Sequence, residues 1–247
     1  MSKPSKHAFA AVEAAKSAWD STGLTYLMRD LVCEVWRTNL ARYEPDELGD
    51  SARTLGFQCF ENLSTRVERR FRGHELERTR WEVDGLRVSK PNGSIRMTVG
   101  GFDAYVMKAP MGAGRRPDWD GLVTWEDETN TRHAIATRNS MSLGGYLSPP
   151  RSQDALVPYA APDRPVDSFL FVWTGEITTG LTAGWLTVPV LGEVPFAAVA
   201  PLWWDEDGEK PRGIRPDTPS GPSFDEMPSA KPALRLKSQA PSARGGA

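Results

Sequence analysis

The first third of the chain repeats apolar residues at the spacing of an amphipathic helix. Between residues 24 and 43 apolar side chains recur every three or four positions, while charged side chains occupy the other side. Pro45 follows this run, and its ring cannot continue the helical hydrogen bonds. The same spacing recurs in two shorter runs, so we predict three helices, over residues 8–20, 24–43 and 57–72. A polar loop is expected from Pro45 to Gly56.

Beyond residue 79 the apolar spacing changes to that of β-strands. Ile95, Met97 and Val99 alternate with polar residues, and a similar alternation runs from Phe102 to Lys108. Turn sequences separate the apolar stretches, namely Pro91-Asn92-Gly93 and Gly100-Gly101. We therefore predict an antiparallel meander of three strands, over residues 81–88, 95–99 and 102–108.

The rest of the chain predicts one more helix, a long loop and further strands. The helix is expected over residues 128–140 and the proline-containing loop over 148–166. Short apolar runs, typical of buried strands, cover residues 169–173, 181–191 and 194–204. The predicted fold class is therefore α+β, with an N-terminal helical layer packed on an antiparallel sheet made of the meander and the C-terminal strands.

Composition divides the chain into a folded part and a tail. Residues 1–209 are expected to form a single α+β domain, helical over 8–72 and sheet-rich over 79–209. Residues 210–247 are rich in Pro, Ser and Gly and poor in large apolar residues, so they predict a disordered tail. The central part of the chain carries the net negative charge, because few basic residues occur there, which argues against a protein that binds nucleic acid over its whole surface.

Two features bear on the compartment. No apolar run is long enough to span a membrane, and the first residues lack the apolar core of a signal peptide. Cys33 and Cys59, the only two cysteines, lie among apolar residues and predict buried free thiols. Two cysteines and three scattered histidines do not supply the ligand spacing of a zinc site. We expect a cytoplasmic protein without a membrane partner.

The predicted order of elements resembles the αβββαβ core of the PD-(D/E)XK nuclease superfamily over roughly residues 24–175. This resemblance concerns topology and not sequence motifs. It implies a carboxylate on the second strand, a Glu/Asp-x-Lys motif on the third, and Mg²⁺ held by those carboxylates, since hard cations prefer oxygen ligands. A divergent nuclease of this type would fit a toxin or a phage-defence component.

The chain departs from that motif on the third strand. Asp103 and Lys108 are five residues apart, so they face opposite sides of a strand. A degenerate metal site would have to combine carboxylates from several elements with that lysine. Its candidate residues are Glu34, Glu61, Asp84, Asp103 and Lys108. Whether any acidic cluster binds metal is left open by the sequence.

Arginines gather at the end of the third predicted helix. Arg66, Arg69, Arg70 and Arg72 could contact phosphates, which would make this patch a nucleic-acid-binding site. A solvated helix end is the alternative, because arginine is favourable near the negative end of the helix dipole.

Aromatic and apolar residues near the C-terminus suggest a different function. Trp203 and Trp204 end the last predicted strand, and Leu234 and Leu236 form a small basic-apolar island in the tail. Such residues can dock on a partner, although core packing explains the tryptophans as well. Because no motif specifies a chemistry, the main expectation is an interaction or regulatory protein whose partner is another protein. The nuclease and nucleic-acid hypotheses stand as alternatives, with the substrate, partner and oligomeric state undetermined.

Overall fold

The structure is a computed structural model. It describes residues 6–72, 82–110, 114–115, 119, 122–123, 125, 131–147 and 165–205. The predicted tail and most of the predicted loop over 148–166 lie outside these residues. The described helices and strands are α1 (Lys6–Ser21), α2 (Leu24–Leu40), α3 (Ala52–Val67), η1 (Glu68–Arg72), β1 (Arg87–Ser89), η2 (Pro91–Gly93), β2 (Arg96–Val99), β3 (Phe102–Lys108), α4 (Thr131–Leu147), β4 (Ser168–Gly175), β5 (Thr182–Pro189) and β6 (Phe196–Trp204).

The predicted α+β fold is confirmed. The six strands form one sheet in sequence order, and every neighbouring pair is antiparallel except β3 and β4. The parallel pair is possible because α4 lies between β3 and β4 in the chain and returns it to the starting end of the sheet. The αβββαβ order expected from the nuclease resemblance is therefore present from α2 to β4.

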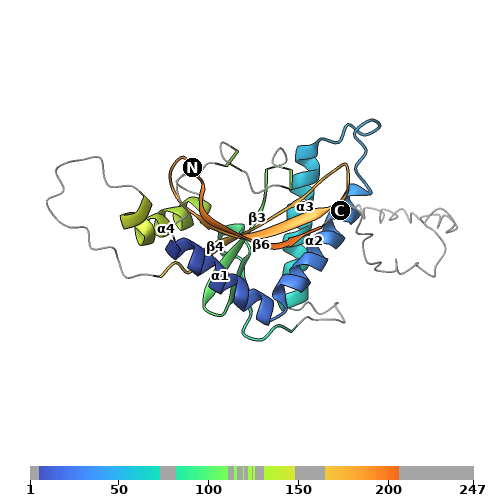
Figure 1. Ribbon diagram of the computed structural model, residues 1–247. Helices are drawn as coiled ribbons and strands as arrows, with labels where there is room; N and C mark the ends of the chain where they lie inside the picture. Colours follow the sequence, from blue (N-terminus) through green and yellow to red (C-terminus); the bar gives the residue numbers. More distant parts are fainter. Residues whose placement is uncertain are drawn as a thin grey trace, which may run out of the picture. The chain divides into compact units, whose positions relative to one another are not determined.

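Helices cover one face of the sheet, and a second apolar cluster covers the other. Side chains of α1, α2 and α3 pack with inward residues of the strands, as the ribbon in Figure 1 shows for α1 and α2 beside β4 and β6. Residues of α4 pack with Trp119 and Trp125 on the opposite face. All eight positions of both β4 and β5 are buried, as expected for strands covered on both faces.

Local chemistry explains where the element bounds differ from prediction. The third helix begins at Ala52, because the side chain of Ser51 caps it by accepting a hydrogen bond from the backbone N–H of Thr54 at 3.1 Å. The second helix ends at Leu40, before Pro45. The first strand is only three residues long, whereas β3 has the predicted bounds.

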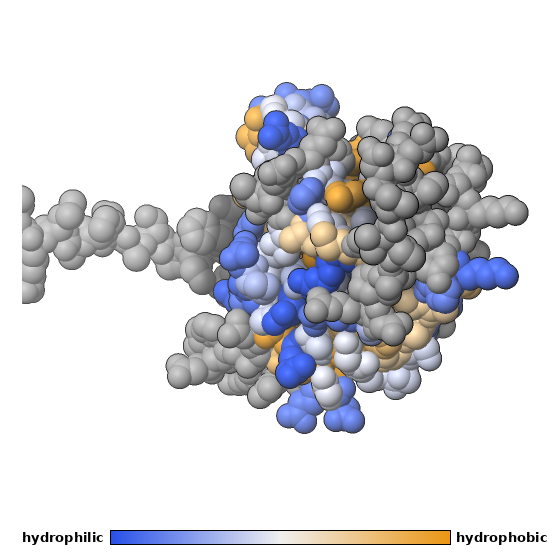
Figure 2. Space-filling view, turned by 90° about the vertical axis from the view of Figure 1, so that its left-hand side faces the viewer, coloured by the Kyte–Doolittle hydropathy of each residue, from blue (hydrophilic) through white to orange (hydrophobic). Residues whose placement is uncertain are grey.

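The turns follow the predicted chemistry. Gly100 and Gly101 both have positive φ, which suits the tight hairpin between β2 and β3. Asn92 also has positive φ, within the short helical turn η2. Where Figure 2 shows described residues, hydrophilic and hydrophobic ones are interspersed. No helix in the described part of the chain is long and apolar enough to cross a membrane.

Candidate functional site: a lysine pocket at the carboxyl end of β3

The only parallel pair among the described strands brings two carboxyl ends together. Lys108, the last residue of β3, pairs in register with Trp173 of β4. β3 ends at Lys108, whereas β4 continues for two more residues, to Gly175, before the turn to β5. In open sheets with parallel strands, such carboxyl ends are where ligands commonly bind.

Lys108 continues the inward-facing positions of β3. Ala104 and Val106 precede it on the same side of the strand, and both are buried against the helical layer. The Nζ atom of Lys108 lies 5.6 Å from the ring centroid of Trp36 on α2 and 5.5 Å from that of Trp173. Both distances allow cation–π attraction, so the two indoles hold the ammonium group at the end of the strand.

Burial sets the protonation of the groups around this lysine. Loss of hydration lowers the pKa of Lys108 from 10.5 to about 8, because the low-dielectric surroundings disfavour the charged form. The neighbouring Cys59 on α3 is fully buried, and burial raises the pKa of its thiol to about 11. The amine of Lys108 therefore titrates closer to neutral pH than that of an ordinary lysine, whereas Cys59 remains a protonated thiol.

An open pocket of about 410 Å³ lies beside Lys108. Its wall is formed by the first turns of α3 and by the residues that end β3. The lining residues are Arg53, Gly56, Phe57, Lys108, Ala109 and Pro110. Phe57 is 68% exposed, although it is a large apolar residue. Two cationic side chains on a mostly apolar wall suit a small ligand that combines an apolar body with a negative group.

The predicted metal ligands are not brought together with Lys108. Glu34 forms an ion pair with Arg66, and Asp103 accepts a hydrogen bond from the hydroxyl of Thr98 at 2.6 Å. Glu61 is exposed on α3, and Asp84 is exposed in a turn before β1. Within the described ranges, no three acidic, histidine or cysteine side chains form a group that could hold a metal ion.

The residue two positions before Lys108 explains why the nuclease motif is incomplete. That position shares the inward face of β3 with the lysine, and it would carry the acidic residue of a Glu/Asp-x-Lys motif. Val106 occupies it and is 2% exposed within the main core. The lysine of this strand therefore has an apolar neighbour on its own strand where the motif would place a carboxylate.

The predicted arginine patch is partly neutralised. Arg66 is paired with Glu34 of α2, which directs its charge toward a neighbouring helix. Arg69 is exposed and Arg70 is half-buried, within the π-helical turn η1. The side chain of Arg72 lies outside the described residues. The patch thus offers fewer cations to a phosphate backbone than the sequence suggested.

The two tryptophans predicted to bind a partner have different environments. Trp203 is only 7% exposed, and its Nε1–H donates to the hydroxyl of Thr182 at 3.1 Å, so it is a core residue and cannot present its ring to a partner. Trp204 is 42% exposed, with the guanidinium of Arg115 5.1 Å from its ring centroid. Leu234 and Leu236 lie outside the described residues.

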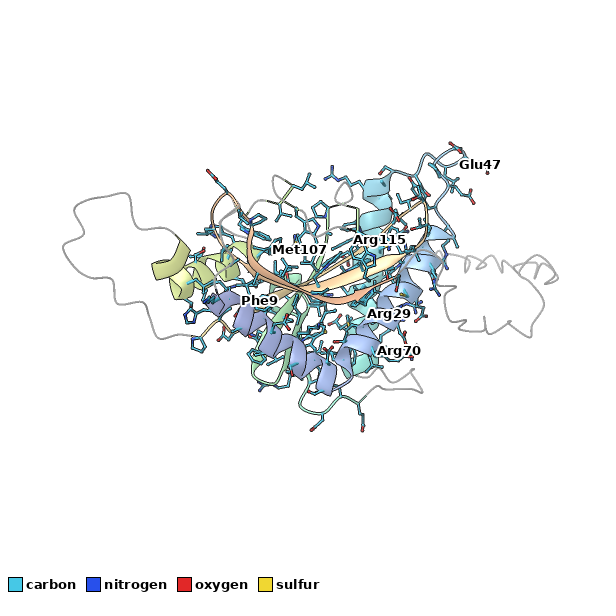
Figure 3. All side chains as sticks on the ribbon, viewed as in Figure 1. Phe9, Arg29, Glu47, Arg70, Met107 and Arg115 are labelled. Atoms are coloured by element: carbon cyan, nitrogen blue, oxygen red, sulfur yellow. The ribbon has the colours of Figure 1, made fainter. Side chains whose placement is uncertain are left out.

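A buried carboxylate ties the end of β6 to α2. Asp205 accepts hydrogen bonds from Arg29 Nη2 at 2.7 Å and from the hydroxyl and backbone N–H of Thr182 at 2.7 and 3.0 Å. Figure 3 labels Arg29 and also Arg115, whose guanidinium donates to the backbone carbonyl of Asp205. Burial alone would raise the pKa of Asp205, but these hydrogen bonds outweigh it and hold the pKa below its usual value. This network is structural, because its polar groups satisfy one another.

Sequence reasoning named Lys108 but missed the residues that surround it. The signal in the sequence was the alternation along β3, which places Lys108 on the inward side of the strand. A lysine is seldom buried without a compensating interaction. Trp36 and Trp173 come from distant parts of the chain, and nothing local marks them as its neighbours. Comparisons with protein-family models, with curated proteins and with solved structures found no match to this chain.

Proposed function

We propose that the protein is a regulatory binding protein and that its recognition site is the pocket beside Lys108. The observation that carries this proposal is a half-buried lysine between two indole rings on the wall of an open pocket. A group that shifts its pKa through burial and lines a pocket is a common mark of a functional site. A lysine with only a structural role would more often extend its ammonium into water.

The chemistry of the wall supports an organic anion as the ligand. Arg53 and Lys108 supply positive charge, while Phe57 and Pro110 supply apolar surface. A carboxylate near Lys108 would stabilise the protonated amine, which offsets part of the cost of burying it. The pocket volume lies in the range of small-molecule sites, which are usually lined by apolar residues and a few polar groups.

Benzoate is a suitable probe, because it joins one carboxylate to one aromatic ring. We expect millimolar benzoate to shift the indole N–H signals of Trp36 and Trp173 in a ¹H–¹⁵N NMR titration. Lys108→Met should weaken binding about tenfold or more, since a charge-assisted contact is worth roughly 1.5–3 kcal/mol. Lys90→Met is the matched control, because Lys90 lies at the surface with Glu68 at 3.4 Å. Equal binding by both variants would overturn the proposed site.

The free cysteines bear on where the protein works. Cys33 and Cys59 are both unpaired, and burial raises the pKa of each thiol. Unpaired thiols persist in a reducing compartment, so we propose that the protein acts in the cytoplasm. A fusion to a fluorescent protein, followed by fractionation of the producing cells, tests this placement.

A metal-dependent nuclease, such as a toxin or defence component, is the second candidate function. The order of elements from α2 to β4 favours it, since a three-stranded meander, a helix and a strand parallel to β3 follow one another. The described carboxylates do not supply its ligand group. Cleavage of DNA or RNA that requires Mg²⁺ or Mn²⁺, and that is lost in Asp103→Asn and Lys108→Met, would establish this function in place of the first.

A further inference from the structure

The amine of Lys108 combines three conditions that a nucleophilic lysine needs. Lys108 lines an open pocket of about 410 Å³, a volume that a small molecule can enter. Its position is fixed by the ring faces of Trp36 and Trp173 and by a 3.5 Å contact with the carbonyl oxygen of Ala109. Burial also increases the share of neutral amine, the form that attacks electrophiles.

We propose that Lys108 captures an organic anion carrying an aldehyde or ketone group by forming a reversible Schiff base. This inference rests on the proposed function, because it names the ligand class of the same pocket. The carboxylate of such a ligand, for instance a 2-oxo acid, would lie toward Arg53, the second cation of the wall. The carbonyl carbon would then face Nζ of Lys108.

The reaction needs no oxidant or reductant. The lone pair of the neutral Nζ attacks the carbonyl carbon, and the C=O electron pair moves to oxygen, which takes a proton from the attacking nitrogen. The resulting carbinolamine loses its oxygen as water when the C=N bond forms. The product gains a proton to become an iminium cation. The indole faces that attract the ammonium group also attract this cation, so the site stabilises the charge of the product.

At pH 7 a larger fraction of Lys108 than of an ordinary surface lysine is in the neutral form that attacks a carbonyl carbon. Lowering the pKa from 10.5 to about 8 raises the neutral fraction at pH 7 roughly 300-fold. A weaker base is also a weaker nucleophile, so the net advantage in rate is smaller, on the order of tenfold. Cys59 does not compete, because its thiol is fully buried with a pKa of about 11.

Reductive trapping tests this inference on the full chain. The protein is incubated at pH 7 with glyoxylate and sodium cyanoborohydride, which delivers hydride to the imine carbon and fixes the adduct as a secondary amine. Peptide mapping by mass spectrometry then gives the rate at each lysine. We expect Lys108 to be modified at least about tenfold faster than Lys90, an advantage that unfolding in urea should abolish.

The outcomes separate this inference from the proposed function. Lys108→Arg removes the nucleophile, so this variant should lose the fast adduct. If benzoate binds the wild-type protein and glyoxylate modifies Lys108 no faster than Lys90, the Schiff base is overturned and the binding function stands. If benzoate does not bind and no lysine is modified selectively, both proposals fall. The comparison of Lys108 with Lys90 needs only the peptide map of the wild-type protein. The test therefore does not depend on whether a variant folds.

Discussion

The indole of Trp36 lies against the backbone of Gly175, where any side chain would overlap it. A Cβ atom built on this glycine would collide with the ring atoms Cδ2, Cε2 and Cγ of Trp36. Gly175 ends β4, two residues after Trp173, so the absence of a side chain there lets α2 approach the strand end. The glycine thereby helps to place one of the two rings that hold Lys108.

Gly175→Ala should therefore destabilise the fold. We expect a loss of about 1–3 kcal/mol in the free energy of unfolding, because overpacking forces a buried ring or the backbone to shift. Urea denaturation followed by tryptophan fluorescence measures this loss. In a double-mutant cycle with Trp36→Leu the two effects should be clearly non-additive, since the smaller side chain relieves the overlap. Additive losses would show that the two residues do not constrain each other.

The pKa of Lys108 predicts a pH dependence of stability. Because this pKa is about 8 in the folded chain and 10.5 when unperturbed, the folded chain binds fewer protons between these values. The free energy of unfolding contributed by Lys108 is therefore lowest below pH 8 and rises as pH increases toward 10.5. Relative to Lys108→Met, the wild-type protein should gain about 1–3 kcal/mol between pH 7 and pH 10.

Urea denaturation at several pH values measures this gain. Lys90→Met is the control, and its difference from the wild-type protein should stay nearly constant over the same pH range, because Lys90 lies at the surface. A constant difference between the wild-type protein and Lys108→Met would mean that the ammonium group is well hydrated, and the proposed site would lose its main support.

Asp205→Asn should weaken the junction between β6 and α2. The neutral amide loses the charge-assisted bond from Arg29, so we expect a loss of about 1–3 kcal/mol at pH 7. Since the pKa of Asp205 is below its usual value of 3.8, its stabilisation is present above pH 4 and disappears as pH falls through the lowered pKa. The gap between wild type and variant should therefore close in strong acid.

Asp20 provides an exposed control for the loss of stability in Asp205→Asn. Asp20 accepts a hydrogen bond from the hydroxyl of Thr25 at 2.6 Å, but this pair is exposed. Asp20→Asn should cost well under 1 kcal/mol. Equal losses for Asp20→Asn and Asp205→Asn would contradict the view that Asp205 holds the end of β6 in place.

Cys59 should be unreactive in the folded protein. It is fully buried and its pKa is about 11, so iodoacetamide at pH 8 should modify it on the order of 100-fold more slowly than in urea. Mass spectrometry of the alkylated peptides gives the rate. Alkylation of the native protein at the rate seen in urea would show that α3 does not cover the region beneath Lys108.

The sequence predicted elements well where their signals are local. The bounds of β3 match the alternation from Phe102 to Lys108, and the glycine pair before it marks the hairpin. The start of α3 was missed because Ser51 acts as a cap within a stretch that reads as a polar loop. The parallel pairing of β3 with β4 depends on the path of the chain around the sheet, which no short segment encodes.

The candidate site was less predictable, because its character comes from contacts between distant segments. The alternation placed Lys108 on the inward side of its strand, but it did not identify Trp36, Trp173 or the pocket wall on α3. Trp203, in contrast, was predicted to contact a partner, but it is a core residue. Its position at the end of an apolar strand suggested a surface for a partner, whereas the close approach allowed by Gly184 buries its ring.

The most direct test of the central claim compares benzoate with benzamide, a neutral molecule of almost the same shape. Each is titrated into the wild-type protein while the indole N–H signals of Trp36 and Trp173 are followed by NMR. If the pocket recognises an organic anion, benzoate binds at least about tenfold more tightly than benzamide and shifts both signals. Equal affinities, or shifts that spare both indoles, would contradict the claim that Lys108 marks a binding site for anions.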